Sequence, residues 1–157
     1  MFDPSALDTI TACYHEAGHA MIAHWIGGTV LMCTIETEDD TLGGRTSVEW
    51  RGLSTAERRR CSALVALGGP IAEAHHRRDL DLLESIAAWE ADWREIATAL
   101  AAQPPSSRRE QTLRGWIAEV ARQLEDPNQW ERLCRVADAL AAHETIDRAL
   151  FLDAISD

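Results

Sequence analysis

The sequence predicts a mainly α domain that includes a small β hairpin or sheet (α+β class). Its 157 residues fit one domain, and 46% hydrophobic with 26% charged residues is a globular composition. Helix caps and Gly or Pro breaks divide the chain into helices around one short β segment. We therefore expect a single domain over residues 1–157, in which a linker near residues 103–107 separates residues 1–102 from a helical segment over residues 108–157.

The N-terminal segment begins with a predicted helix over residues 5–26, which opens on a capping-box-like sequence and stops at a glycine pair. Residues 30–36 have strand composition. The polar residues 37–44 then turn the chain, and residues 45–50 can return as the antiparallel partner.

A capping box at Ser54 opens a second predicted helix through Leu67. The segment Gly68-Gly69-Pro70 is expected to kink or end that helix, because proline lacks the N–H that a helix interior needs. Residues 71–76 can continue it.

The remaining chain is predicted to be helical. Residues 79–102 have helical composition, with a break near Trp89 left open. Two more helices are expected over 108–125 and 128–142, and a short one from about Thr145.

The composition also limits the partners and the compartment. With 15 basic and 26 acidic residues, the formal net charge is -11, which disfavours nucleic acid and anionic membrane surfaces. No apolar run is long enough to insert into a membrane, and no secretory signal is visible. The scattered cysteines form no C-x-x-C pair. We expect a soluble cytoplasmic protein with reduced thiols.

The segment His15-Glu16-Ala17-Gly18-His19 has the spacing of a zinc site on a helix. Residues four apart lie roughly 40° apart around a helix, so both imidazoles can reach one metal ion. Zinc accepts neutral nitrogen ligands in tetrahedral geometry, and the neighbouring Glu16 can take a proton from a zinc-bound water. The expected zinc ligands are His15 and His19, and the expected catalytic residue is Glu16.

A third zinc ligand must come from elsewhere in the chain. Ile22 and Trp25 stand where metzincins have Gly and His, which excludes that subclass. His24 is expected to face away from the motif, and the pair His75-His76 to form a solvated helix end. The acidic candidates are Glu73, Asp79, Asp81, Glu84 and Asp92.

Four segments in order resemble the proteolytic domain of the FtsH-type ATP-dependent zinc metalloproteases. The first is the motif preceded by Tyr14, as in that family's H-E-A-G-H motif. Residues 42–46 (LGGRT) resemble its strand entry, and residues 64–73 (LVALGGPIAE) its L-x-x-L-x-G-G-R-A-A-E helix. Residues 136–155 resemble its closing helices with their E-T-L-D turn.

The resemblance implies that the third ligand is an aspartate at the start of a helix, in a pattern like N-D-x-x-x-A-T. Residues 91–98 (ADWREIAT) match this best, which makes Asp92 the expected ligand. The spacing from the glycine pair is longer than in the family, and the glycine-rich loop before the aspartate is absent. Asp79 and Asp81 therefore stay open. No AAA ATPase module is present in these residues, so ATP-driven unfolding is not implied.

These observations favour a soluble zinc-dependent metallopeptidase that hydrolyses unfolded or flexible polypeptides without ATP. The alternative is a catalytically inactive, zinc-stabilised binding or regulatory domain related to the same family. The expected partner is a polypeptide substrate, and a homo-oligomer or a separate adaptor is left open.

Overall fold

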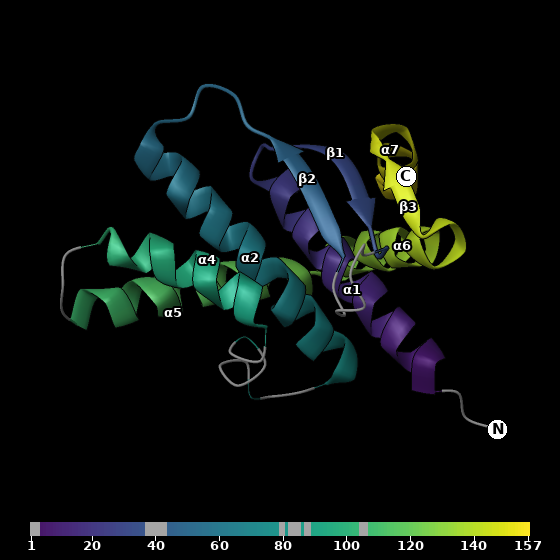
Figure 1. Cartoon of the computed structure of the whole chain (residues 1–157), viewed down its shortest axis with the longest axis horizontal. Helices are drawn as coiled ribbons and strands as arrows, with labels where there is room; N and C mark the ends of the chain where they lie inside the picture. Colours follow the sequence, from purple (N-terminus) through teal and green to yellow (C-terminus); the bar gives the residue numbers. More distant parts are fainter. Residues whose placement is uncertain (1–3, 37–43, 79–80, 82–85, 87–88, 104–106) are drawn as a thin grey trace.

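The structure is a computed structural model that describes residues 4–36, 44–78, 81, 86, 89–103 and 107–157. Within these ranges the chain is mainly helical with one small antiparallel sheet, which confirms the predicted fold class (Figure 1). The elements in order are α1 (Pro4–Trp25), β1 (Thr29–Thr34), β2 (Arg45–Glu49), α2 (Thr55–Arg77), α4 (Glu90–Ala101), α5 (Ser107–Glu125), α6 (Pro127–His143), β3 (Thr145–Asp147) and α7 (Arg148–Ile155).

The helices α1 and α2 pack against each other along the centre of the molecule (Figure 1). Their closest approach is at Gly18 and Gly68. A Cβ on Gly18 would lie 2.2 Å from the carbonyl oxygen of Gly68, and one on Gly68 would lie 2.6 Å from that of Gly18. Only glycine fits at these two positions, and the close contact brings the HExxH face of α1 against α2.

Helix α2 does not end at Gly68-Gly69-Pro70, which was one of the two outcomes expected from the sequence, but runs through to Arg77. Its start agrees with the prediction, because Ser54 and Glu57 form a complete capping box. A proline inside a helix costs about 3 kcal/mol. Twelve residues between Cys61 and Ala74 are buried, so the tertiary packing of this segment outweighs the local preference for a break.

The sheet has the order β2-β1-β3, with both pairs antiparallel. The hairpin partners β1 and β2 were predicted; the turn at residues 37–43 lies outside the described residues. The short helix expected from about Thr145 is wrong at its start, since residues 145–147 form β3 and α7 begins at Arg148. Glu144 takes a positive φ of 64° and ends α6, which turns the fully buried Ile146 towards Cys33 of β1.

The other helices surround the central pair. Helices α4 and α5 pack on α2, while α6 packs on α1 and carries α7 towards the sheet. Trp89 is not helical (φ −99°, ψ 89°), so α4 starts directly after it. The break near Trp89 that the sequence left open is therefore present.

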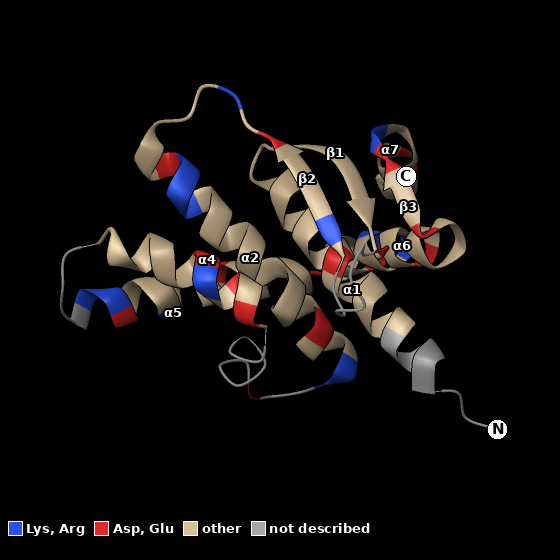
Figure 2. Cartoon of the chain, in the orientation of Figure 1, with Lys and Arg blue, Asp and Glu red and all other residues tan. Residues whose placement is uncertain are grey.

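Figure 2 shows where charged residues fall along α2, α4 and α5. Among the Asp, Glu and Arg residues whose exposure the structure describes, Glu16 and Glu73 are the buried ones. No helix in the described ranges is both long enough and apolar enough to cross a bilayer. All four cysteines are free; Cys13, Cys33 and Cys61 are buried and Cys134 is half-buried.

The close approach of α1 and α2 predicts that Gly18→Ala destabilises the protein. The added methyl group meets backbone atoms that cannot move aside, so we expect a loss of about 1–3 kcal/mol in the free energy of unfolding. Gly115→Ala is the matched control, since a Cβ there meets nothing within 4 Å; in an exposed helix it should stabilise by up to about 1 kcal/mol. Urea unfolding in the presence of a chelator measures both, and equal effects would contradict the packing argument.

Candidate metal centre

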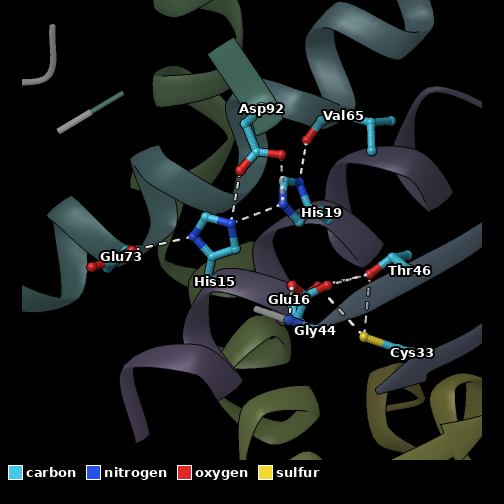
Figure 3. A network of polar contacts seen from close by, with 9 residues as sticks. All are labelled: His15, Glu16, His19, Cys33, Gly44, Thr46, Val65, Glu73 and Asp92. Atoms are coloured by element: carbon cyan, nitrogen blue, oxygen red, sulfur yellow. Dashed lines mark hydrogen bonds and ion pairs between the residues drawn. The ribbon is translucent and has the colours of Figure 1, made fainter. Parts of the chain in front are cut away.

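Helix α1 directs three polar side chains of the motif into the protein interior. His15 and Glu16 are each 3% exposed and His19 is 8% exposed. Ala17 and Ala20 beside them are fully buried, so this face of α1 is inside the protein. Buried polar groups need partners. The cluster in Figure 3 supplies them from α2, α4 and β2.

The Nδ1 atom of each imidazole, on the side away from the centre of the cluster, contacts α2. His19 Nδ1 lies 2.6 Å from the carbonyl oxygen of Val65, and because a carbonyl only accepts, this nitrogen carries the hydrogen. His15 Nδ1 lies 3.2 Å from Glu73 Oε2, and Arg77 pairs with the other oxygen of Glu73 at 3.1 Å. Such outer partners fix the ring orientation of metal-binding histidines. Both Nε2 atoms are therefore directed at the centre of the cluster.

Asp92, in the first turn of α4, completes the cluster. Its Oδ2 lies 2.9 Å from His15 Nε2, its Oδ1 lies 3.3 Å from His19 Nε2, and the two Nε2 atoms are 3.0 Å apart. Burial would raise the pKa of Asp92, but the two histidines outweigh it and hold this pKa well below its usual range. Burial lowers the pKa of His19, yet Asp92 and Glu16 outweigh it and raise this pKa to about 9.

This arrangement fits a bound cation. With hydrogen on both Nδ1 atoms, the two Nε2 atoms and the carboxylate of Asp92 present three electron pairs to the same point. Ligands at 2.0–2.1 Å from a tetrahedral zinc ion are about 3.3 Å apart, close to the separations in this cluster. Two imidazoles and one carboxylate also form a typical donor set for hydrolytic zinc.

Gly69 leaves room for an ion. A Cβ on this residue would lie 2.5 Å from His19 Nε2 and 2.7 Å from His15 Nε2. Any larger residue would thus fill the space that the two nitrogens face. The sequence suggested that this glycine marks a helix break. In the structure it lies inside α2, opposite the two histidines, and leaves the space in front of their Nε2 atoms open.

Glu16 stands beside the three donors. Its Oε1 accepts a hydrogen bond from the Gly44 N–H, and its Oε2 accepts one from the Thr46 hydroxyl, both at 3.1 Å. Donor atoms of Glu16 and of the two histidines lie within 4.8 Å of one another, so Glu16 is a second carboxylate within reach of an ion. Asp92 is better placed than Glu16 to be a ligand, because both of its oxygens contact the Nε2 atoms. Both oxygens of Glu16 already accept hydrogen bonds from Gly44 and Thr46, at the start of β2.

A cavity of about 460 Å³ opens onto the cluster. Trp89 forms part of its wall and packs against the His15 ring, with 3.9 Å between the ring centroids. The remaining walls come from β2 with Trp50 directly after it, from α2 and from α4. Their apolar members include Val48, Trp50, Val65 and Ala66, and their charged members are Arg45 and Glu95.

The structure brings together all four residues that the sequence placed in the site, namely His15, Glu16, His19 and Asp92. Of the alternatives for the third ligand, Asp81 is exposed and does not line the cavity. Asp79 and Glu84 lie outside the described residues. Glu73, one of the acidic candidates, contacts the far side of His15 and holds that ring.

Three other histidines of α1 and α2 lie outside the cluster. His24 faces away from it, as predicted; His75 is exposed, as expected for a solvated helix end, whereas His76 is half-buried. His24 packs against Phe151 at the end of α1. In the last turn of α2, His76 stacks on Tyr14 and His75 contacts Trp130. Tyr14 points away from the cluster into this aromatic group.

Sequence reasoning did not identify Trp89, Thr46 or the Val65 carbonyl as components of the site. A backbone carbonyl carries no sequence signal. Glu73 does carry a sequence signal, because an acidic residue within the apolar run Ile71-Ala72-Glu73-Ala74 indicates a buried carboxylate that needs a partner.

No protein-family model matches the chain, and no curated protein matches it. The resemblance to FtsH-type peptidases therefore depends on the sequence segments described above.

Replacing the third ligand should remove zinc binding. We expect Asp92→Ala to lower zinc affinity by more than the roughly 10–100-fold typical of losing a residue that only orients a ligand, because one of three protein ligands is gone. Asp81→Ala should bind zinc as the parent does. Competition titration against a zinc chelator measures both, and parent-like affinity in Asp92→Ala would move the ligand elsewhere.

Filling the space at Gly69 should have a similar effect by a different route. Gly69→Ala keeps every donor, yet its methyl group would occupy the space between the Nε2 atoms, so we expect zinc affinity to fall by at least about tenfold. Gly115→Ala is again the control. Unchanged affinity in a folded Gly69→Ala protein, checked by circular dichroism, would show that the ion does not sit at this point.

Proposed function

We propose that this protein is a zinc-dependent metallopeptidase that hydrolyses peptide bonds in unfolded or flexible polypeptides. The observation that carries the proposal is the position of Glu16. Its carboxylate borders the cavity beside three converging donors and is held there by Gly44 and Thr46. A purely structural zinc site has no use for such a group.

His15, His19 and Asp92 would hold the zinc ion, which would supply Lewis-acid polarisation of the scissile carbonyl and lower the pKa of water towards 7. Glu16 acts as general base: it takes the proton of the attacking water and delivers it to the leaving amine. The hydrogen bonds from Gly44 and Thr46 keep its carboxylate directed at the cavity during both transfers.

The sheet offers a place for the substrate. Among the described strands, β2 pairs with β1 alone, so its other edge can accept an extended peptide as an added strand. Side chains of such a peptide would alternate between the two faces of the sheet. Those on the inner face would enter the apolar cavity lined by Val48 and Trp50, and a folded protein could not present such a segment.

A second candidate function is a zinc-stabilised binding or regulatory domain. The observation that favours it is the burial of the cluster where α1, α2 and α4 meet, since zinc bound there would join three helices and contribute to folding. This candidate requires zinc but not Glu16.

The variant Glu16→Gln separates the two candidates. We expect it to bind zinc as the parent does and to cleave an unfolded, casein-like substrate about 10²–10⁴ times more slowly, because the amide cannot accept the proton. Glu125→Gln, an exposed change at the end of α5, should cleave like the parent.

Fluorescence release from labelled substrate, with and without chelator, measures these rates. Equal cleavage by Glu16→Gln and the parent would show that Glu16 is not the base. A zinc-loaded parent that cleaves nothing would instead support the binding domain.

A further inference from the structure

The cavity extends from the cluster along the N-terminal half of α2. Ser62 and Val65 line the cavity, and Arg58 lies one turn before Ser62 on the same face of the helix. Arg59 flanks this face. Side chains on a helix tilt towards its N-terminus, so both arginines extend the wall outwards from the cavity. We call Arg58 and Arg59 the basic rim.

The two arginines of the basic rim are exposed and form no ion pair with any residue that the structure describes. Their neighbour Arg60 differs. It points to the opposite side of α2 and contacts both oxygens of Glu119 on α5, at 2.7 and 2.9 Å. The protein has a net charge of -11, so two positive charges without a partner among the described residues are available to bind an acidic group. Figure 2 shows the basic stretch at the start of α2.

The distance from the metal centre to the basic rim can be counted along α2. The Val65 carbonyl accepts the hydrogen bond of His19, so Val65 marks the level of the cluster. Arg58 is seven residues earlier, about 10 Å along the helix axis. An extended peptide advances about 3.3 Å per residue, so a guanidinium that reaches outward would meet a substrate residue about three to five positions from the reacting bond.

We propose that the site selects polypeptide segments that carry acidic side chains about three to five residues from the bond to be cleaved, and that Arg58 and Arg59 bind these carboxylates. This rests on the proposed peptidase function. Guanidinium groups pair with carboxylates through two parallel hydrogen bonds. The charged residues of the cavity itself have both signs: Glu16 and Asp92 belong to the cluster, Arg45 lines the wall from β2, and Glu95 lines it from α4, where it opposes acidic substrates.

The test compares two labelled peptides that share a central apolar segment. One carries Glu and the other Gln at the third to fifth positions on either side of it. Their affinities are measured by fluorescence anisotropy at low salt with zinc-loaded Glu16→Gln protein, so that no cleavage interferes. We expect about 3–10-fold tighter binding of the Glu peptide, the range for two exposed ion pairs, and a smaller preference as salt increases.

Three variants in the Glu16→Gln background locate the effect. Arg58→Gln with Arg59→Gln should remove the preference. Arg122→Gln with Arg148→Gln makes the same change in net charge on arginines that do not line the cavity, and should keep it. Glu95→Gln, which removes an opposing charge, should increase it.

Equal binding of the two peptides, or an equal loss of preference in both double-arginine variants, would overturn the proposal. Failure of the peptidase function gives a different result. If the parent binds the Glu peptide more tightly but cleaves neither peptide, the role of the basic rim is supported and the peptidase function is contradicted. If the parent cleaves both peptides with equal kcat/KM, the peptidase function is supported and the role of the basic rim is contradicted.

Discussion

The close contact of α1 with α2 is the constraint on which the rest of the structure depends. Gly18 and Gly68 let the two backbones approach to a distance that no side chain would allow. This approach places the Val65 carbonyl within 2.6 Å of His19 and brings Glu73 to His15. It also puts the bare backbone of Gly69 opposite both Nε2 atoms. The motif histidines are thus oriented by a neighbouring helix, and their own helix supplies only the spacing.

The two carboxylates of the cluster have different environments. Glu16 and Asp92 lie near the same imidazoles but have different neighbours. Donors from the edge of β2 bind Glu16, whereas the histidines themselves bind Asp92 and hold its pKa low. This difference in environment arises from the elements that surround each residue. Under the proposed function, it would leave Glu16 for proton transfer and Asp92 for the metal.

Much of this could be predicted from local sequence. The spacing of His15 and His19 fixes their common face, because helix geometry is regular. The glycine pair marks the end of α1, and the capping box marks the start of α2. The uninterrupted course of α2 through Pro70 could not be read from the sequence, since it depends on packing against α1 that outweighs a local cost. The strand at Thr145–Asp147 was missed because three residues carry too little periodicity, and their pairing with β1 is remote in sequence. Asp92 was expected from the family resemblance alone, with Asp79 and Asp81 left open, because the contact between Asp92 and His15 spans 77 positions of the chain.

X-ray absorption spectroscopy of the zinc-loaded protein tests the central claim most directly, namely that His15, His19 and Asp92 form one zinc site. We predict nitrogen and oxygen neighbours at about 2.0–2.2 Å from the zinc, together with the longer-range scattering of two imidazoles. One imidazole contribution should disappear in His19→Ala. A sulfur ligand at about 2.3 Å, or a spectrum without imidazole scattering, would contradict the claim.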